Sequence, residues 1–178
     1  MATVFTIGHS TRDLADFSRI LQAHDVRLLE DIRAFPASRR YPHFNREQLE
    51  LWLPEIGVDY IWEKDLGGRR NQQMPRDQSP NVALRNDSFR NYADYMLSPQ
   101  FQAGVVRLVD SAAQRNTVIM CAEALYFRCH RMLVSDYLVS QGHTVLHILD
   151  ESSPKQHALT KDAWIVEGRL VYRGDYLL

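Results

Sequence analysis

Short apolar segments typical of β-strands alternate along this chain with segments whose apolar residues recur at helical spacing. Such alternation, with short connections, favours parallel strands joined by crossover helices that cover both faces of the sheet. We therefore expect an α/β fold with three layers, a doubly wound and mainly parallel sheet. The predicted strands are 3–7, 26–32, 58–62, 117–121 and 144–149, and the predicted helices begin near 10 and 45 and span 88–97, 99–115 and 127–141.

Local signals define the ends of several elements. Ser10 or Thr11 is the expected N-cap of the first helix, and Asp13 is spaced for a capping box with Ser10. Residues 66–86 have little periodicity, which predicts a long functional loop. Two short apolar runs on either side of Gly168 predict a small C-terminal hairpin at the edge of the sheet.

The bulk properties are those of an ordinary globular chain. A length of 178 residues is most economically one domain, in which 151–178 form a C-terminal extension. There is no apolar run of the roughly 18 to 20 residues that cross a bilayer, and the first residues do not resemble a signal peptide. Two cysteines do not make a secreted disulfide framework. We expect a soluble, cytoplasmic protein without a membrane partner.

The basic residues are unusual in type and in distribution. Arginine accounts for 18 of the 21 basic residues, and two windows, 32–46 and 66–76, contain arginines but no acidic residue. Arginine suits planar, bidentate binding of phosphate or carboxylate. One interpretation is a solvated, arginine-rich face, and the other is a local anion-binding surface.

Reactive or anion-binding side chains follow several of the predicted strands. In an open α/β sheet the loops that leave the carboxyl ends of the strands gather at one edge, where ligands bind. His9 and Ser10 follow the first strand, Asp31 and Arg33 the second, and Cys121 ends a later one. Ser10 is explained by capping, and Asp31 is expected to pair with Arg33, whereas His9 is available for acid–base chemistry or phosphate binding.

The two cysteines each allow two interpretations. Cys121 precedes a predicted helix N-terminus, which stabilises thiolates, yet the six-residue interval to Arg128 does not match Cys-x5-Arg enzymes, and Glu123 would raise the thiol pKa. Cys129 is predicted in the first turn of a helix beside Arg131. Either thiol is a nucleophile or a buried, inert residue. A redox pair is also conceivable if they face each other across the loop.

His130 also allows two interpretations, and the Gly67-Gly68 turn is a candidate for binding an anion. His130 lies on a helical stripe with apolar residues, so it is either a core histidine bonded to a carbonyl or a proton-transfer group. The two glycines allow a turn that brings backbone N–H groups and Arg69 to an anion. The spacing of cysteines and histidines does not match a structural zinc site, so no metal site is predicted, and no particular cofactor is implied.

The assembled motifs resemble one known family. They are Thr6-Ile7-Gly8-His9-Ser10, Asp31-Ile32-Arg33 with Pro36 and Ser38-Arg39, His43-Phe44-Asn45, Leu66-Gly67-Gly68, Phe89 to Tyr95, Met120-Cys121-Ala122-Glu123 and Cys129-His130-Arg131. Together they resemble the uncharacterised domain of unknown function 488, over residues 3 to about 150. The resemblance implies an α/β domain with a shared site and implies no activity.

Three functional hypotheses follow from the residues. The leading one is an enzyme for a phosphorylated substrate, a nucleotide or a nucleic-acid end; the second is a nucleic-acid or nucleotide binding module without catalysis; the third is a cysteine-based redox or metal sensor. The residues alone leave open whether the chain is an enzyme. The candidate catalytic residues are Cys121, Cys129, His130, His9 and Glu123, and the candidate binding residues are Arg33, Arg39, His43, Asn45, Gly67, Gly68, Arg69, Arg70, Arg131 and Ser10.

Overall fold

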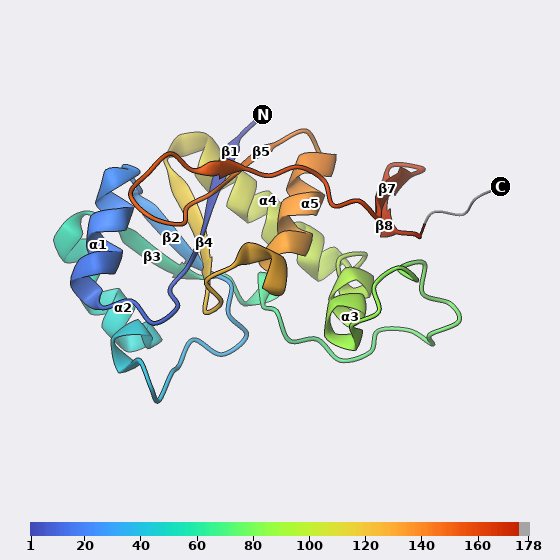
Figure 1. The fold of residues 1–178 in the computed structure, drawn as a ribbon, viewed down its shortest axis with the longest axis horizontal. Helices are drawn as coiled ribbons and strands as arrows, with labels where there is room; N and C mark the ends of the chain where they lie inside the picture. Colours follow the sequence, from blue (N-terminus) through green and yellow to red (C-terminus); the bar gives the residue numbers. More distant parts are fainter. Residues whose placement is uncertain (175–178) are drawn as a thin grey trace.

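The computed structural model describes residues 1–174 and has a six-stranded sheet at its centre (Figure 1). The order of strands across the sheet is β3-β2-β4-β1-β5-β6, and the first five of these strands run parallel to one another. The strands are β1 (Thr3–Gly8), β2 (Leu28–Asp31), β3 (Asp59–Trp62), β4 (Thr117–Cys121), β5 (Thr144–His147) and β6 (Lys155–Gln156).

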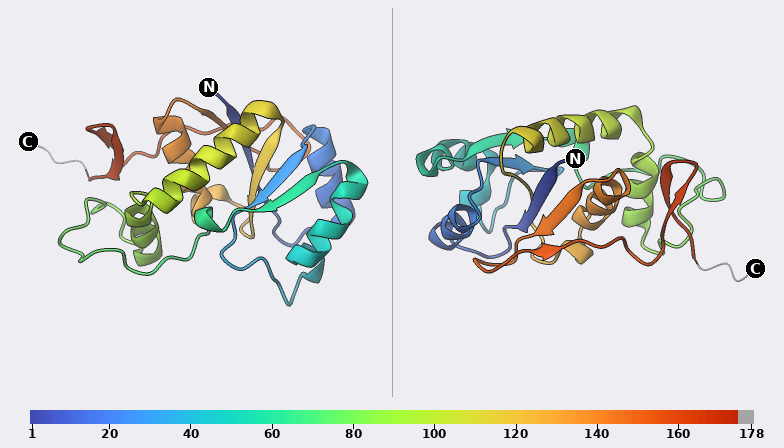
Figure 2. Two further views of the ribbon diagram at one scale, coloured as in Figure 1. Left: turned by 180° about the vertical axis from the view of Figure 1, so that it is seen from behind. Right: turned by 90° about the horizontal axis from the view of Figure 1, so that it is seen from above.

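Helices cover both faces of the sheet, each over its own apolar core (Figure 2). On one face, α1 (Leu14–Ala23) and α2 (Arg46–Trp52) pack on side chains such as Ile7 and Val118. On the other face, α3 (Asp87–Tyr95), α4 (Pro99–Gln114) and α5 (Arg131–Ser140) pack on Val4 and Ile119. The neighbouring residues Val118 and Ile119 serve opposite cores because successive strand side chains point to opposite faces. The predicted doubly wound α/β fold is confirmed.

The first helix begins later than its sequence signals indicated. Asp13, not Ser10 or Thr11, is the N-cap of α1, and its carboxylate accepts from the backbone N–H of Asp16 at 2.7 Å. Ser10 has a φ of 51°, in the left-handed region that non-glycine residues seldom adopt. The predicted capping box is wrong, because Ser10 lies in a left-handed turn three residues before the residue that caps the helix.

The helix predicted over 127–141 is shorter than expected. A 3-10 turn at Tyr126–Arg128 is followed by Cys129 and His130, and α5 starts only at Arg131. The prediction that Cys129 lies in the first helical turn is therefore wrong. The two residues lie in the bend between the turn and the helix.

The C-terminal part of the chain also differs from expectation. The predicted hairpin forms from β7 (Ala163–Val166) and β8 (Arg169–Tyr172), but as a separate two-stranded sheet and not at the edge of the main one. The edge is instead occupied by β6, which pairs antiparallel with β5 and was not predicted. A two-residue strand has no periodicity that a sequence pattern can display. Among the described residues, no helix has the length and hydropathy that crossing a bilayer requires.

Candidate functional site

A cleft of about 1020 Å³ opens at the carboxyl edge of the sheet. The loops after β1, β2 and β4 form it, together with the Gly68-Arg69 turn and the start of α3. Backbone hydrogen bonds continue past the strand ends, since His9 N–H donates to the carbonyl of Cys121 and Ser10 N–H to that of Ala122, both at 2.9 Å. This pairing fixes the β1 loop beside the β4 loop. Segments distant in sequence thus converge at this edge. The loops after β1, β2 and β4 and the Gly68-Arg69 turn were expected there, whereas the start of α3 was not.

Two glycines allow this convergence. A Cβ on Gly8 would lie 1.8 Å from the carbonyl oxygen of Glu123, and one on Gly68 would lie 2.4 Å from Nδ1 of His130. Any larger residue at either position would therefore force the β4 loop or the histidine ring to move. Both glycines are explained by close approach, and neither requires a positive φ.

Cys121 and Cys129 form the floor of the cleft. Both are buried, both line the cavity, and their Sγ atoms lie 2.7 Å apart. This separation is shorter than an ordinary contact between sulfur atoms and longer than the roughly 2.05 Å of a disulfide bond. The 3-10 turn between the two residues folds the chain back so that the thiols face each other, as one of the sequence interpretations required.

Arg131 lies beneath this floor and binds both sides of it. Its side chain is almost fully buried, and its Nε donates to Sγ of Cys121 at 3.0 Å. The guanidinium also donates to the carbonyls of Glu123 and Ala124. Its backbone N–H, the first of α5, donates to Sγ of Cys129 at 3.4 Å. Arg131 therefore does not reach into the cleft as a substrate ligand, but it places positive charge against the thiols.

These surroundings act oppositely on the two thiols. Burial raises the pKa of Cys121, and so does its hydrogen bond with Cys129. Burial also raises the pKa of Cys129, but the hydrogen bond with Cys121 and the charge and N–H of Arg131 outweigh it and lower that pKa to about 7. Near pH 7 about half of Cys129 is therefore thiolate, while Cys121 keeps its proton. Glu123, expected to raise the thiol pKa, has an exposed side chain and contributes its carbonyl instead.

His130 closes the cleft behind Cys129. Its Nε2 donates to the carbonyl of Ile32 at 2.9 Å, and its Nδ1 lies 3.3 Å from Sγ of Cys129. Burial lowers its pKa, so the ring is neutral at pH 7. The sequence allowed either a core histidine bonded to a carbonyl or a proton-transfer group. His130 does bond a backbone carbonyl, and it also faces a thiol.

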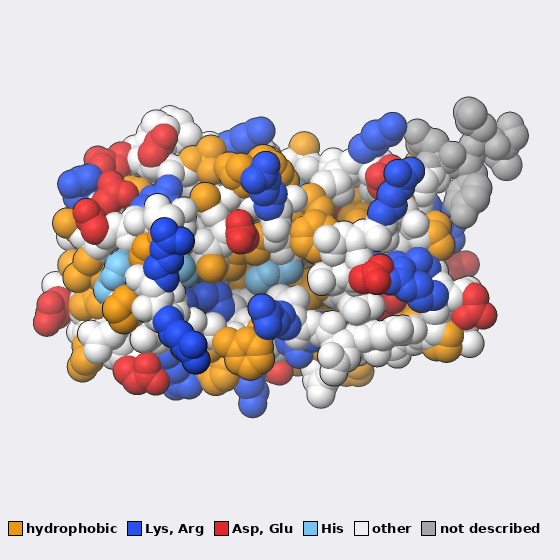
Figure 3. Space-filling view, turned by 60° about the horizontal axis from the view of Figure 1, so that its bottom comes forward, with side chains coloured by type: hydrophobic (Ala, Val, Ile, Leu, Met, Phe, Trp, Pro, Cys, Tyr) orange, Lys and Arg blue, Asp and Glu red, His pale blue; other side chains and the backbone are white. Residues whose placement is uncertain are grey.

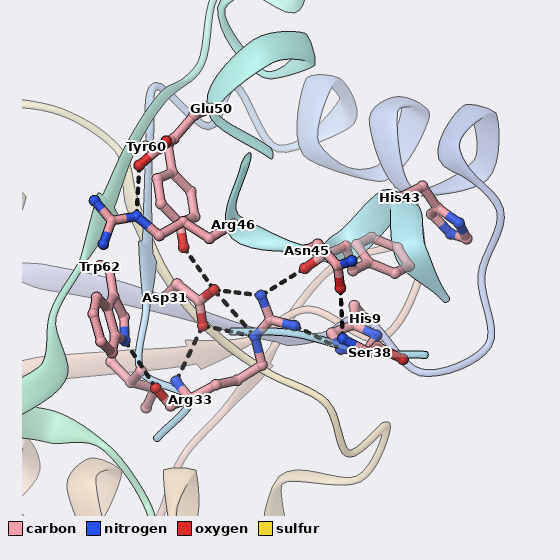
Figure 4. Close-up of polar contacts among 12 residues, drawn as sticks. His9, Asp31, Arg33, Ser38, His43, Asn45, Arg46, Glu50, Tyr60 and Trp62 are labelled. Atoms are coloured by element: carbon pink, nitrogen blue, oxygen red, sulfur yellow. Dashed lines mark hydrogen bonds and ion pairs between the residues drawn. The ribbon is translucent and has the colours of Figure 1, made fainter. Parts of the chain in front are cut away.

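One wall of the cleft is built around a buried ion pair (Figure 4). Arg33 donates from Nε to both carboxylate oxygens of Asp31, at 2.8 and 3.1 Å, and its Nη2 reaches the carbonyl of Phe44 at 2.7 Å. Tyr60 adds a hydroxyl donor to Asp31 at 2.8 Å. The expected Asp–Arg pair is confirmed. Arg33 is therefore mostly occupied, and a ligand meets only its Nη1.

That remaining nitrogen faces His9. The Nη1 atom of Arg33 lies 3.5 Å from Nε2 of His9, while Nδ1 of the ring donates to the carbonyl of Ser10 at 2.9 Å. The ring also stacks on Phe44, with centroids 4.3 Å apart. Burial, together with the charge of Arg33, lowers the pKa of His9 to about 4. The imidazole is therefore neutral, and its Nε2 accepts hydrogen bonds.

The rim of the cleft is positively charged. Arg40, Arg69 and Arg128 line the rim. Among the described residues that line the cleft, Glu123 is the only acidic one. Within residues 1–174, no carboxylate lies at ion-pair distance from any of these three arginines. Figure 3 shows basic side chains gathered around the middle of this face, with histidine surface between them.

An exposed aromatic side chain stands among these arginines. Phe35 is 68% exposed and lines both the cleft and an adjoining hollow of about 820 Å³. The guanidinium carbon of Arg69 lies 5.8 Å from its ring centroid. Exposure of so large an apolar ring has a cost in water. Its position between two hollows offers a surface on which a flat ligand stacks.

Several candidate residues lie elsewhere. Arg39 is exposed outside the cleft, where Arg40 takes the lining position. His43 donates to the carbonyl of Arg12 at 2.9 Å, and the side-chain oxygen of Asn45 accepts from the N–H of Ser38, so both shape loops. Gly67 also lies outside the cleft, and Arg70 lines the adjoining hollow and packs 3.9 Å from the ring centroid of Tyr95. The candidates that line the cleft are His9, Ser10, Arg33, Gly68, Arg69, Cys121, Glu123, Cys129 and His130.

Other lining residues were not among the site residues expected from the sequence. Asn86, Ser88 and Phe89, at the start of α3, close one side of the cleft. The sequence shows that a helix begins there, but the long loop before it hides which edge of the sheet it reaches. Among the described residues, no three histidine, cysteine or acidic side chains are grouped to hold a metal ion.

Comparison with known proteins identifies one family. The family model described as "Domain of unknown function DUF488" matches residues 13–138, well over half of the chain. The chain belongs to the DUF488 family. No curated protein and no solved structure gave a significant match. The DUF488 match includes both cysteines and Arg131, whereas His9, β5 and the C-terminal segment lie outside it.

Proposed function

We propose that this DUF488 protein is a thiol-dependent enzyme that acts on a phosphorylated substrate, a nucleotide or the end of a nucleic acid. The observation that carries the proposal is a thiol of lowered pKa, Cys129, in the floor of a cleft whose rim holds three arginines without a carboxylate partner among residues 1–174. A thiolate is a strong nucleophile at neutral pH, and arginines bind phosphate oxygens through paired N–H donors.

The chemistry assigns a role to each group. The Cys129 thiolate attacks the substrate phosphorus, so that an S–P bond forms while the P–O bond to the leaving group breaks. The leaving oxygen takes a proton from solvent, and water then hydrolyses the S–P bond and releases phosphate. Neutral His9, whose Nε2 accepts, is the group that orients this water. Arg40, Arg69 and Arg128 hold the phosphate oxygens.

The exposed aromatic ring indicates the rest of the substrate. Phe35 lies beside Arg69 at the junction of two hollows, and stacking of a base on an aromatic ring contributes roughly 1 to 3 kcal/mol. A base on Phe35 and a phosphate on the arginines describe a nucleotide. The adjoining hollow provides room for a further residue of a single strand.

The test uses a 5′-phosphorylated thymidine pentanucleotide and its unphosphorylated form. We expect the phosphorylated strand alone to slow alkylation of Cys129, and phosphate to be released from it by the native protein but not by Cys129→Ser. The double variant Arg40→Met, Arg69→Met should lose protection, while Arg169→Met, which changes an exposed arginine of the hairpin outside the cleft, should keep it. If the phosphorylated strand protects Cys129 from alkylation but no phosphate is released, the protein is a binding module and not an enzyme. If both strands protect Cys129 equally, the cleft does not recognise the phosphate and that part of the proposal is wrong.

A second candidate function rests on the 2.7 Å between the two sulfur atoms. In it, Cys121 and Cys129 are a dithiol that reduces a low-molecular-weight disulfide: each thiol loses a proton and an electron, one S–S bond forms, and the oxidant becomes two thiols. We expect the free-thiol count to fall from two to zero in oxidised glutathione and to recover in dithiothreitol. A stable mixed disulfide with glutathione on one cysteine would contradict this candidate.

A further inference from the structure

A chain of buried polar groups lies behind the thiol site and returns to the helix from which it starts. Thr6 of β1 lies 2.7 Å from Nδ1 of His147, and Nε2 of His147 lies 2.9 Å from Nδ1 of His157. Nε2 of His157 lies 2.9 Å from a carboxylate oxygen of Asp136 in α5. All four side chains are buried. Arg131, the first residue of the same helix, reaches Thr6 from Nη1 at 3.4 Å.

The groups at the two ends of this chain of polar contacts set the direction of the hydrogen bonds there. Arginine only donates, so the Thr6 hydroxyl accepts from Arg131, and the same hydroxyl lies within hydrogen-bond distance of Nδ1 of His147. At the other end, Nε2 of His157 donates to the carboxylate of Asp136, and Nδ1 of His157 lies within hydrogen-bond distance of Nε2 of His147. Burial, with the charge of Arg131 among the further causes, lowers the pKa of His147 to about 3, so the ring of His147 is neutral.

Asp136 is held in place by the C-terminal segment. Its carboxylate also accepts from the N–H and hydroxyl of Thr160, at 2.9 and 2.6 Å, and from the hydroxyl of Tyr172 at 2.9 Å. Figure 1 shows the segment after β6 running past β5 and α5 toward the hairpin. Four donors satisfy this buried charge, so the segment and α5 are fixed relative to each other.

The chain also contacts the loop between the cysteines. The ring of Tyr126 stacks on that of His147, with centroids 3.5 Å apart and planes at 6°. Tyr126 opens the 3-10 turn that separates Cys121 from Cys129. His147 therefore supports the thiol site at two points, through Thr6 to the guanidinium and through Tyr126 to the turn.

We propose that Thr6, His147 and His157 are positioning residues for the thiol site, acting through Arg131 and the turn at Tyr126. The inference rests on the proposed role of the thiols, and it makes the segment beyond the DUF488 match a working part of the site. Without the acceptor at Thr6, one N–H of the buried guanidinium is unpaired, and Arg131 gains freedom to turn away from Cys121. Its charge then stabilises the Cys129 thiolate less.

The experiment measures the rate of alkylation of Cys129 against pH in the substrate-free protein. Thr6→Val has nearly the same shape but no hydroxyl, and we expect it to raise the apparent pKa of Cys129 by about one unit. Thr6→Ser should restore the native value. Thr117→Val is the matched control, because Thr117 is a buried strand threonine whose hydroxyl bonds the carbonyl of Arg115 and does not touch this chain. Melting temperatures identify any variant that fails to fold.

A second variant tests the end of the polar chain that lies in the C-terminal segment. His157→Leu should shift the profile in the same direction, while the fold is monitored by circular dichroism. An unchanged profile in folded Thr6→Val would overturn the inference. A native profile without any thiol of lowered pKa would instead overturn the proposed function, so the two failures are distinguishable.

Discussion

The Nε atom of Arg131 lies 3.0 Å from Sγ of Cys121, and both groups are buried. A buried cation next to a thiol is a stabilising arrangement only while the thiol pair carries a negative charge or the cation has other acceptors. Arg131 meets both conditions. The lowered pKa of Cys129 gives the thiol pair negative charge, and the carbonyls of Glu123 and Ala124 are further acceptors for the guanidinium. The same contact thus links the stability of the β4 loop to the reactivity of the thiols.

Replacing this cation tests its effect on the thiolate. We expect Arg131→Met to raise the pKa of Cys129 and to slow its alkylation at pH 7 about tenfold, because the positive charge and its donors are lost. Arg128→Met removes an exposed arginine from the cleft rim and should leave the thiol pKa nearly unchanged. Iodoacetamide kinetics read by mass spectrometry measure both. Equal rates in the two variants would contradict the role given to Arg131.

Glu30 should make the free energy of unfolding depend on pH. It lies 1% exposed in β2 with one carboxylate oxygen unbonded, and burial raises its pKa to about 7. The native state therefore binds more protons than the unfolded state between about pH 4.5 and 7, and stability falls as pH rises through that window. Glu30→Gln should abolish this decrease, which is about 2 to 3 kcal/mol of the free energy of unfolding across the window. Urea unfolding at several pH values measures it, and parallel curves for both proteins would contradict it.

His9 should remain neutral well below its ordinary titration range. Because its pKa is lowered to about 4, the native state binds fewer protons than the unfolded state between about pH 4 and 6.5, so this histidine reduces stability as pH falls through that window. Nitrogen-15 NMR should show a proton on Nδ1, as the bond to the Ser10 carbonyl requires. Titration near pH 6.5, or a proton on Nε2, would show that the ring is not held as described.

Gly68 should tolerate no side chain. A Cβ there lies 2.4 to 2.8 Å from three atoms of the His130 ring, so Gly68→Ala should displace the ring or the turn and cost about 1 to 3 kcal/mol. Gly174→Ala is the matched control, since a Cβ on Gly174 meets no atom of residues 1–174 within 4 Å. Thermal unfolding compares the two variants, and the thiol pH profile of Gly68→Ala reports whether His130 has moved. Equal stability of both variants would contradict the close packing.

The sequence by itself determined the layers and the edge at which the site lies. Alternating strand and helix patterns are local properties, and parallel strands with crossover helices follow from them. Because His9, Arg33 and Cys121 stand at or just after the ends of parallel strands, their positions in the chain alone assign them to one edge of the sheet. The Asp31–Arg33 pair was also predictable, since the two residues are separated by a single position.

Only the tertiary structure decided what these residues do there. Burial and partners at long sequence distance set the contacts of Arg131, which was expected to bind a ligand and instead contacts Cys121 and Thr6. The start of α5, two residues later than the thiol it was expected to contain, follows from the 3-10 turn that brings the sulfur atoms together. The link from Asp136 to His157 joins residues 21 positions apart through a segment without periodicity. A pattern in sequence records which face a residue takes, whereas the pairing of buried polar groups depends on how distant segments pack.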